Sequence, residues 1–181
     1  LPATSSARPF YWSVRRELWE HRSLYLAPAI VALVLLLAMI VGAFKLPPAI
    51  ATFDALSPDK QRELASAPYA IVALILVATA MVVALFYCLD ALFGERRDRS
   101  VLFWKSMPVS DRTAVLAKVA VPMLVVPAFL FVLITATQLF VLLGNVLVWG
   151  VKGLSVSNLL QRLPLLDMPV GVAYLVITLA L

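Results

Sequence analysis

The 181-residue chain has one cysteine, Cys88, and one histidine, His21. A single cysteine excludes an intramolecular disulfide and any C-x-x-C motif, and a single histidine cannot supply the pair of an H-E-x-x-H zinc site. The chain also lacks the G-x-x-x-x-G-K-[ST] loop that binds ATP and the G-x-S-x-G turn of serine hydrolases. We therefore expect no catalytic, cofactor-binding or metal-binding residues, and we interpret Cys88 as inert packing.

Charged side chains are scarce as well. They make up 14% of the chain, whereas hydrophobic residues make up 63% and the mean hydropathy is +0.98. A soluble domain is about 25% charged. Residues 24–44 and 119–143 contain no charge, and 69–93 contain only Asp90. Each run reaches the length of about 20 residues that a helix needs to cross a bilayer, and none alternates as barrel strands do. The sequence predicts an all-α, polytopic membrane protein forming a single transmembrane domain.

The two ends of the sequence differ from the rest. The chain does not begin with Met, and residues 1–9 have the composition of a flexible lead-in. Residues 170–181 are apolar but too few to span a bilayer, which takes about 20 residues. We expect them to open a fourth span, so that the chain is the N-terminal part of a longer protein.

The net charge of +5 is distributed unevenly. Short loops rich in Lys and Arg remain in the cytoplasm, so charge position predicts orientation. The segment before residue 24 and the loop 94–118 hold ten of the fifteen basic residues, namely Arg8, Arg15, Arg16, Arg22, Arg96, Arg97, Arg99, Lys105, Arg112 and Lys118. This distribution predicts a cytoplasmic N-terminus, a cytoplasmic loop 94–118 and external loops 45–68 and 144–169. It indicates membrane topology and no nucleic-acid partner.

Residues 9–22 are predicted to form an interfacial helix on the cytoplasmic membrane surface. Phe10, Tyr11, Val14 and Leu18 are expected to share one face of this helix. Tryptophan and arginine suit the headgroup layer, so the membrane-interface residues are predicted to be Trp12, Arg15, Trp19 and Arg22. The alternative is a cytosolic helix without membrane contact. We expect His21 to be an interface residue and not a proton relay or metal ligand.

Few polar residues occur within the spans. Asp90 lies near the inner end of its span, where it could pair with Arg96 or Arg97 or take part in gating or substrate passage. In the third span, Thr135, Thr137 and Gln138 either line a substrate route or join helices by hydrogen bonds. Pro122 and Pro127 should bend this span because proline removes backbone hydrogen bonds.

The densest charge cluster is the stretch Glu95–Asp111, which reads E-R-R-D-R-S-V-L-F-W-K-S-M-P-V-S-D. Its aromatic and basic residues suit a docking helix, since Trp and Arg are common interface hot spots. We expect Phe103 and Trp104 to act as anchors and the charges to orient the partner, namely Arg96, Arg97, Arg99 and Lys105. The alternative is a loop that enforces topology and binds lipid headgroups.

With the interfacial helix before the first span, this loop resembles that of permease subunits of the bacterial ABC-2 type exporters. The resemblance implies six helices, a bacterial inner membrane and a permease homodimer or heterodimer. It also implies that the loop forms a coupling helix touching a separate ATPase subunit, which holds the ATP and Mg²⁺. The fourth helix is incomplete here, which departs from that pattern. Two other hypotheses stay open: a membrane anchor for a cytosolic partner, and an enzyme whose catalytic residues lie beyond Leu181.

Overall fold

The computed structural model describes residues 7–45, 57–97, 111–151 and 167–180, and these ranges are helical almost throughout, with no strand among them. The elements in chain order are α1 (Ala7–Glu20), α2 (Ser23–Lys45), α4 (Pro58–Arg97), α6 (Asp111–Ala120), η1 (Val121–Val125), α7 (Val126–Val151) and α9 (Asp167–Ala180). Three helical stretches, 23–42, 58–90 and 115–148, are long and apolar enough to cross a membrane. The all-helical prediction is confirmed at this level of detail.

The helix α4 is longer than a single span. It has 40 residues, which at 1.5 Å per residue give a length of roughly 60 Å, against about 30 Å for a hydrocarbon core. It begins at Pro58, and a serine followed by a proline suits the cap and first turn of a helix. The amide of Gln61 donates to the Ser57 carbonyl at 3.0 Å. The polar segment 58–68 and the apolar run 69–93 therefore belong to one continuous helix.

The third long helix contains a π-helical turn between its two prolines. α6 continues directly into η1, and the Val126 amide donates to the carbonyl of Val121, five residues back. Pro122 and Pro127 have no N–H, so the ordinary four-residue bonding pattern cannot run through this segment. Such single π turns occur within α-helices where that pattern is interrupted. The two prolines thus act on the backbone by changing its hydrogen-bond register.

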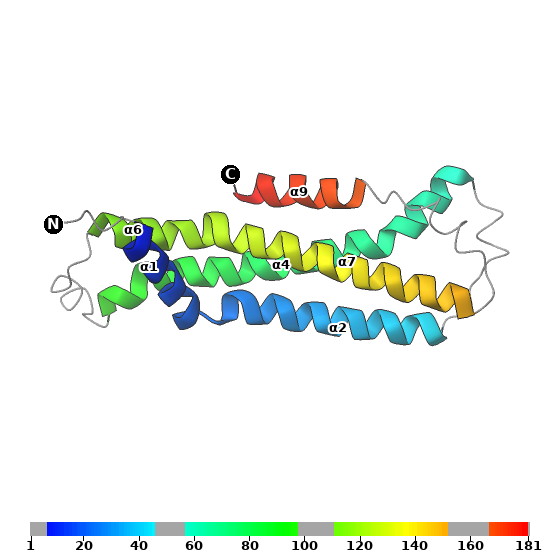
Figure 1. Cartoon of the computed structure of the whole chain (residues 1–181), viewed down its shortest axis with the longest axis horizontal. Helices are drawn as coiled ribbons and strands as arrows, with labels where there is room; N and C mark the ends of the chain where they lie inside the picture. The colour runs from blue at the N-terminus through cyan, green and yellow to red at the C-terminus, as the bar shows by residue number, and fades with distance from the viewer. Residues whose placement is uncertain (1–6, 46–56, 98–110, 152–166, 181) are drawn as a thin grey trace.

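The bundle core lies where α2, α4 and α7 pack together, with α9 alongside α7 (Figure 1). Leu76 and Ile134 are fully buried there, and Val172 and Val176 extend the core onto α9. Ala32 and Ala80 are also buried, which lets the helix backbones approach closely. In a bilayer this association depends on close van der Waals packing, because the lipid tails are as apolar as the helix surfaces.

The helix α1 does not run parallel to the long helices of the bundle. Figure 1 shows it crossing steeply over the end of the bundle at which α4 finishes and α6 begins. It packs on α6 and η1, where Val14 and Leu18 contact a buried cluster containing Tyr87 and Val121. Tyr11, which was expected to share a face with Phe10, Val14 and Leu18, is 59% exposed. At about 100° per residue, Tyr11 stands at the edge of this face, next to Leu18 and farthest around the helix from Phe10.

Candidate functional site

The predicted docking residues fall largely beyond the part of the chain that the structure describes. Arg99, Phe103, Trp104 and Lys105 lie outside the described residues. Arg96 and Arg97 belong to the last turn of α4, and their side chains are outside the described set. The described helices that flank this segment are α4, which ends at Arg97, and α6, which begins at Asp111. The candidate site is therefore built from the side chains at this end of the bundle.

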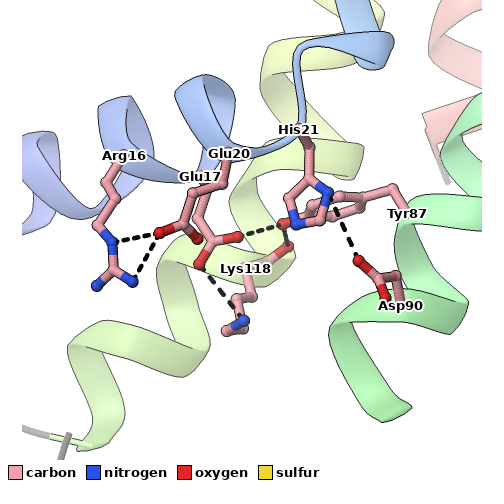
Figure 2. Close-up of polar contacts among 7 residues, drawn as sticks. All are labelled: Arg16, Glu17, Glu20, His21, Tyr87, Asp90 and Lys118. Carbon is pink, nitrogen blue, oxygen red and sulfur yellow. Dashed lines mark hydrogen bonds and ion pairs between the residues drawn. The ribbon is translucent and has the colours of Figure 1, made fainter. Parts of the chain in front are cut away.

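Five side chains from three parts of the chain meet at this end, and we call them the Glu17 cluster: Glu17, His21, Tyr87, Asp90 and Lys118 (Figure 2). Glu17 comes from α1 and His21 from the turn that follows it. Tyr87 and Asp90 come from α4, and Lys118 from α6. The cluster thus ties α1 to both helices that flank residues 98–110.

Glu17 is the centre of this cluster. Its Oε1 lies 3.4 Å from Lys118 Nζ, and its Oε2 accepts a hydrogen bond from the Tyr87 hydroxyl at 3.3 Å. The Glu17 side chain is only 13% exposed and that of Lys118 22% exposed. A carboxylate with so little access to water needs a nearby cation and donors to offset its lost hydration. The tyrosine hydroxyl and the lysine ammonium provide them.

Tyr87 links the two halves of the cluster. It is buried, and besides Glu17 its hydroxyl lies 3.5 Å from the backbone oxygen of Lys118 on α6. The rings of Tyr87 and His21 are nearly perpendicular, with a centroid distance of 4.9 Å and an interplanar angle of 86°. This edge-to-face geometry is the favourable one for aromatic pairs. A single α4 side chain therefore contacts α1, the α1–α2 turn and α6.

Asp90 lies at the exposed edge of the cluster. Its Oδ2 is 3.8 Å from His21 Nδ1, and its side chain is 64% exposed. The two residues form an ion pair when the imidazole is protonated. Sequence reasoning offered Arg96 or Arg97 as partners, whose side chains are not described, and it did not identify His21. Among the described residues no group of three or more His, Cys, Asp or Glu side chains could hold a metal ion.

The predicted membrane-interface residues lie on the other side of α1. Trp12, Arg15 and Trp19 are exposed, and the Arg15 guanidinium lies over both indole rings. Arg22 is exposed in the turn between α1 and α2. One face of α1 carries both apolar and polar side chains and packs against the bundle. The opposite face is aromatic and basic and is directed outward.

The polar residues of the third span lie far from the Glu17 cluster along α7. Gln138 is buried, and its Nε2 donates to the backbone oxygen of Tyr69 on α4 at 3.5 Å. Thr137 Oγ1 donates to the Leu133 carbonyl in its own helix at 2.7 Å. Thr135 Oγ1 is buried without a hydrogen-bond partner in the described part of the chain. About two turns beyond Gln138, the Asn145 amide donates to the Tyr69 hydroxyl at 3.1 Å.

An open apolar groove of about 970 Å³ runs along the other side of the π turn. Phe10 of α1, Leu116 of α6, Met123 of η1, Phe131 of α7 and Val176 of α9 are among the residues that line it. None of the Glu17 cluster contributes to its lining. The side chains that line the groove are all apolar.

Sequence reasoning missed the Glu17 cluster because its members are far apart in the chain. One local signal existed: Glu17 is seven residues after Phe10 and three after Val14, so it lies beside them at the edge of the apolar face of this helix. A carboxylate on a buried face implies a cationic or donor partner, but the pattern cannot say which one. Comparisons with protein-family models, with curated proteins and with solved structures found no match to this chain.

Proposed function

We propose that this chain is the membrane subunit of an ATP-driven exporter of the ABC-2 type, coupled to a separate ATPase through residues 94–118. The observation that carries the proposal is the attachment of α1 to the flanks of this segment. Glu17 bonds to Tyr87 on α4 and pairs with Lys118 on α6, and these helices lead into and out of residues 98–110. A force on the segment would reach α1 through these contacts.

The proposal has a physical basis in the connection between α1 and α2. α1 ends at Glu20 and α2 begins at Ser23, so a displacement of α1 is passed directly to the first membrane span. α2 in turn packs against both α4 and α7. Movement at the coupling segment is thereby transmitted to three spans through side-chain contacts. ATP-driven transport needs such a link between a soluble motor and its membrane helices.

The residues proposed to contact the ATPase are inferred from the sequence. Phe103 and Trp104 are the proposed anchors in a groove of the ATPase. The charges proposed to pair with acidic side chains of the ATPase are Arg96, Arg97, Arg99 and Lys105. The Glu17 cluster then has a different role: it transmits motion and does not bind the ATPase. This division makes the two sets of residues separable by experiment.

The first experiment is purification of the natural full-length protein from its own cells in gentle detergent, with mass spectrometry of co-purifying proteins. A stoichiometric protein with a Walker motif is the expected result. In the reconstituted complex, Trp104→Ala should abolish ATPase binding. Glu17→Ala should retain the ATPase but reduce substrate-stimulated ATP hydrolysis, because the link to α1 is broken.

Other outcomes would replace the proposal. A preparation without any ATPase, even after crosslinking, would favour an anchor or an enzyme over a transporter. An ATPase that binds but shows no substrate-dependent hydrolysis would favour an anchor. Full ATPase binding by Trp104→Ala would show that residues 94–118 are not the coupling element. Leu74→Ala, on the exposed surface of α4, is the control and should leave binding and hydrolysis unchanged.

A further inference from the structure

The outward face of α1 carries an arginine held between two tryptophans. Trp12, Arg15 and Trp19 are three and four residues apart and so share one side of the helix. The Arg15 guanidinium carbon lies 5.2 Å from the centroid of the Trp12 ring and 5.6 Å from that of Trp19. Both distances fall within the range of cation–π attraction. We call these three residues the tryptophan clamp.

The clamp is presented to the surroundings and not to the bundle. Trp12 is 60% exposed and Trp19 is 62% exposed. Large apolar rings are seldom left in water in such a group, and an exposed apolar patch with polar neighbours marks an interaction site. The two rings hold the guanidinium in place, while its edge N–H groups stay available as donors. These donors match the oxygens of a phosphate group in spacing and direction.

The charge of the clamp is not neutralised by α1 itself. Glu20 pairs with Arg16 at 2.7 Å, and Glu17 is occupied by Lys118 and Tyr87 on the opposite face. In the described part of the chain, no carboxylate lies within ion-pair distance of Arg15. The outward face therefore has an unbalanced positive charge, which is complementary to an anionic partner.

The position of the clamp along the chain favours a lipid as this partner. The first membrane span begins at Ser23, about one helical turn after Trp19. Tryptophan concentrates at the level of the lipid headgroups, where its ring meets the hydrocarbon boundary and its N–H meets polar groups. Arg22, three residues after Trp19, is also exposed. A soluble protein partner would have to approach between this face and the headgroups.

We propose that the tryptophan clamp binds the phosphate of an anionic phospholipid, with Arg15 on the phosphate oxygens and the two indole rings at the boundary between headgroups and acyl chains. The preference for an anionic lipid over a zwitterionic one follows from the uncompensated charge. The proposal does not depend on the transport function, since an anchor or an enzyme with the same α1 would bind the same lipid.

The test uses the purified full chain in an uncharged detergent and native mass spectrometry to measure bound lipid. Dioctanoyl phosphatidylglycerol, dioctanoyl phosphatidylcholine and inorganic phosphate are titrated separately. We expect the phosphatidylglycerol to bind most tightly. Arg15→Gln should weaken its binding about fivefold, as removal of one basic group near an anionic lipid does. Arg15→Lys should have an intermediate effect, because it keeps the charge but loses the planar donors.

Arg16→Gln is the matched control. It removes the same charge from the same helix, but the Arg16 side chain pairs with Glu20. The affinity of this variant for phosphatidylglycerol should stay within twofold of that of the unsubstituted protein. Trp12→Phe combined with Trp19→Phe should weaken binding, since phenyl rings attract cations less than indole does. Circular dichroism establishes that each variant keeps its helix content.

Three results would overturn the proposal. Equal weakening by Arg16→Gln and Arg15→Gln would indicate a diffuse charge effect with no defined clamp. Equal affinity for phosphatidylcholine and phosphatidylglycerol would remove the anionic preference. Inorganic phosphate that displaces the lipid at equal concentration would identify a site for a free anion. Loss of ATPase binding or transport has no bearing on these readouts.

Discussion

Glu17 and Lys118 meet at 3.4 Å although two long apolar helices separate them in the sequence. The pair joins α1, which precedes the first long apolar helix, to the start of the third long apolar helix. Because both side chains are mostly shielded from water, the contact differs from an ordinary surface salt bridge. Its strength should be measurable, and it offers the most direct test of how α1 is held.

The first prediction concerns this pair. Glu17→Ala should lower the free energy of unfolding by about 2 kcal/mol, since a shielded ammonium loses its counter-charge and Tyr87 loses its acceptor. Lys118→Ala should have a similar effect. The double variant should lose less stability than the sum of the losses in the two single variants, because both single substitutions remove the same interaction. Denaturant titration in detergent micelles gives all three values.

Additive losses would contradict a direct Glu17–Lys118 interaction. Arg16→Ala is a suitable comparison, since its partner Glu20 is on the same helix and both side chains are almost half exposed. Such exposed pairs contribute about 0.3–0.5 kcal/mol. Arg16→Ala should therefore lower the free energy of unfolding much less than Glu17→Ala does.

The second prediction concerns the hydroxyl of Tyr87. Tyr87→Phe removes the hydrogen bond to Glu17 and keeps the ring that meets His21. The free energy of unfolding should fall by about 1 kcal/mol or slightly more, the usual contribution of a hydrogen bond to a charged acceptor. Tyr174→Phe makes the same chemical change at a position 73% exposed on α9 and should have no measurable effect. Equal effects of the two substitutions would count against the cluster.

The third prediction concerns Gln138. Gln138→Leu removes the hydrogen bond between α7 and the backbone of Tyr69 on α4. Interhelical hydrogen bonds in membrane proteins average about 0.6 kcal/mol, so the loss of stability should be of this size. Thr79→Val serves as control, because the Thr79 hydroxyl donates within its own exposed helix surface to Ile75. If Gln138→Leu stops the proposed transport without changing stability, a role in the substrate route is favoured over helix joining.

The fourth prediction concerns packing in the core. Leu76→Ala should destabilise the protein by about 2–5 kcal/mol, because a fully buried leucine leaves a cavity between α4 and its neighbours. Leu74→Ala is the same substitution two residues away on the same helix, but Leu74 is 63% exposed. Leu74→Ala should therefore destabilise the protein far less than Leu76→Ala. Similar losses at both positions would mean that α4 is rotated from the arrangement described.

Much of the fold follows from local sequence. The runs 24–44, 69–93 and 119–143 have no alternative to helix in an apolar environment, because unpaired backbone groups are too costly there. Ser57 and Pro58 mark the start of α4, and Pro122 and Pro127 mark a disturbed backbone. The proline pattern could not specify a π turn, because the register of the remaining hydrogen bonds depends on how α6 and α7 are held.

The sequence alone therefore determined the helices, their apolar lengths and the aromatic and basic character of α1, since these depend on neighbouring residues. Only the tertiary structure decided which side chains meet. Glu17 is drawn to Lys118 and Tyr87 because α1 packs across the ends of α4 and α6. His21 reaches Asp90 for the same reason. Contacts between distant segments depend on how helices pack, and local periodicity carries no information about the partner.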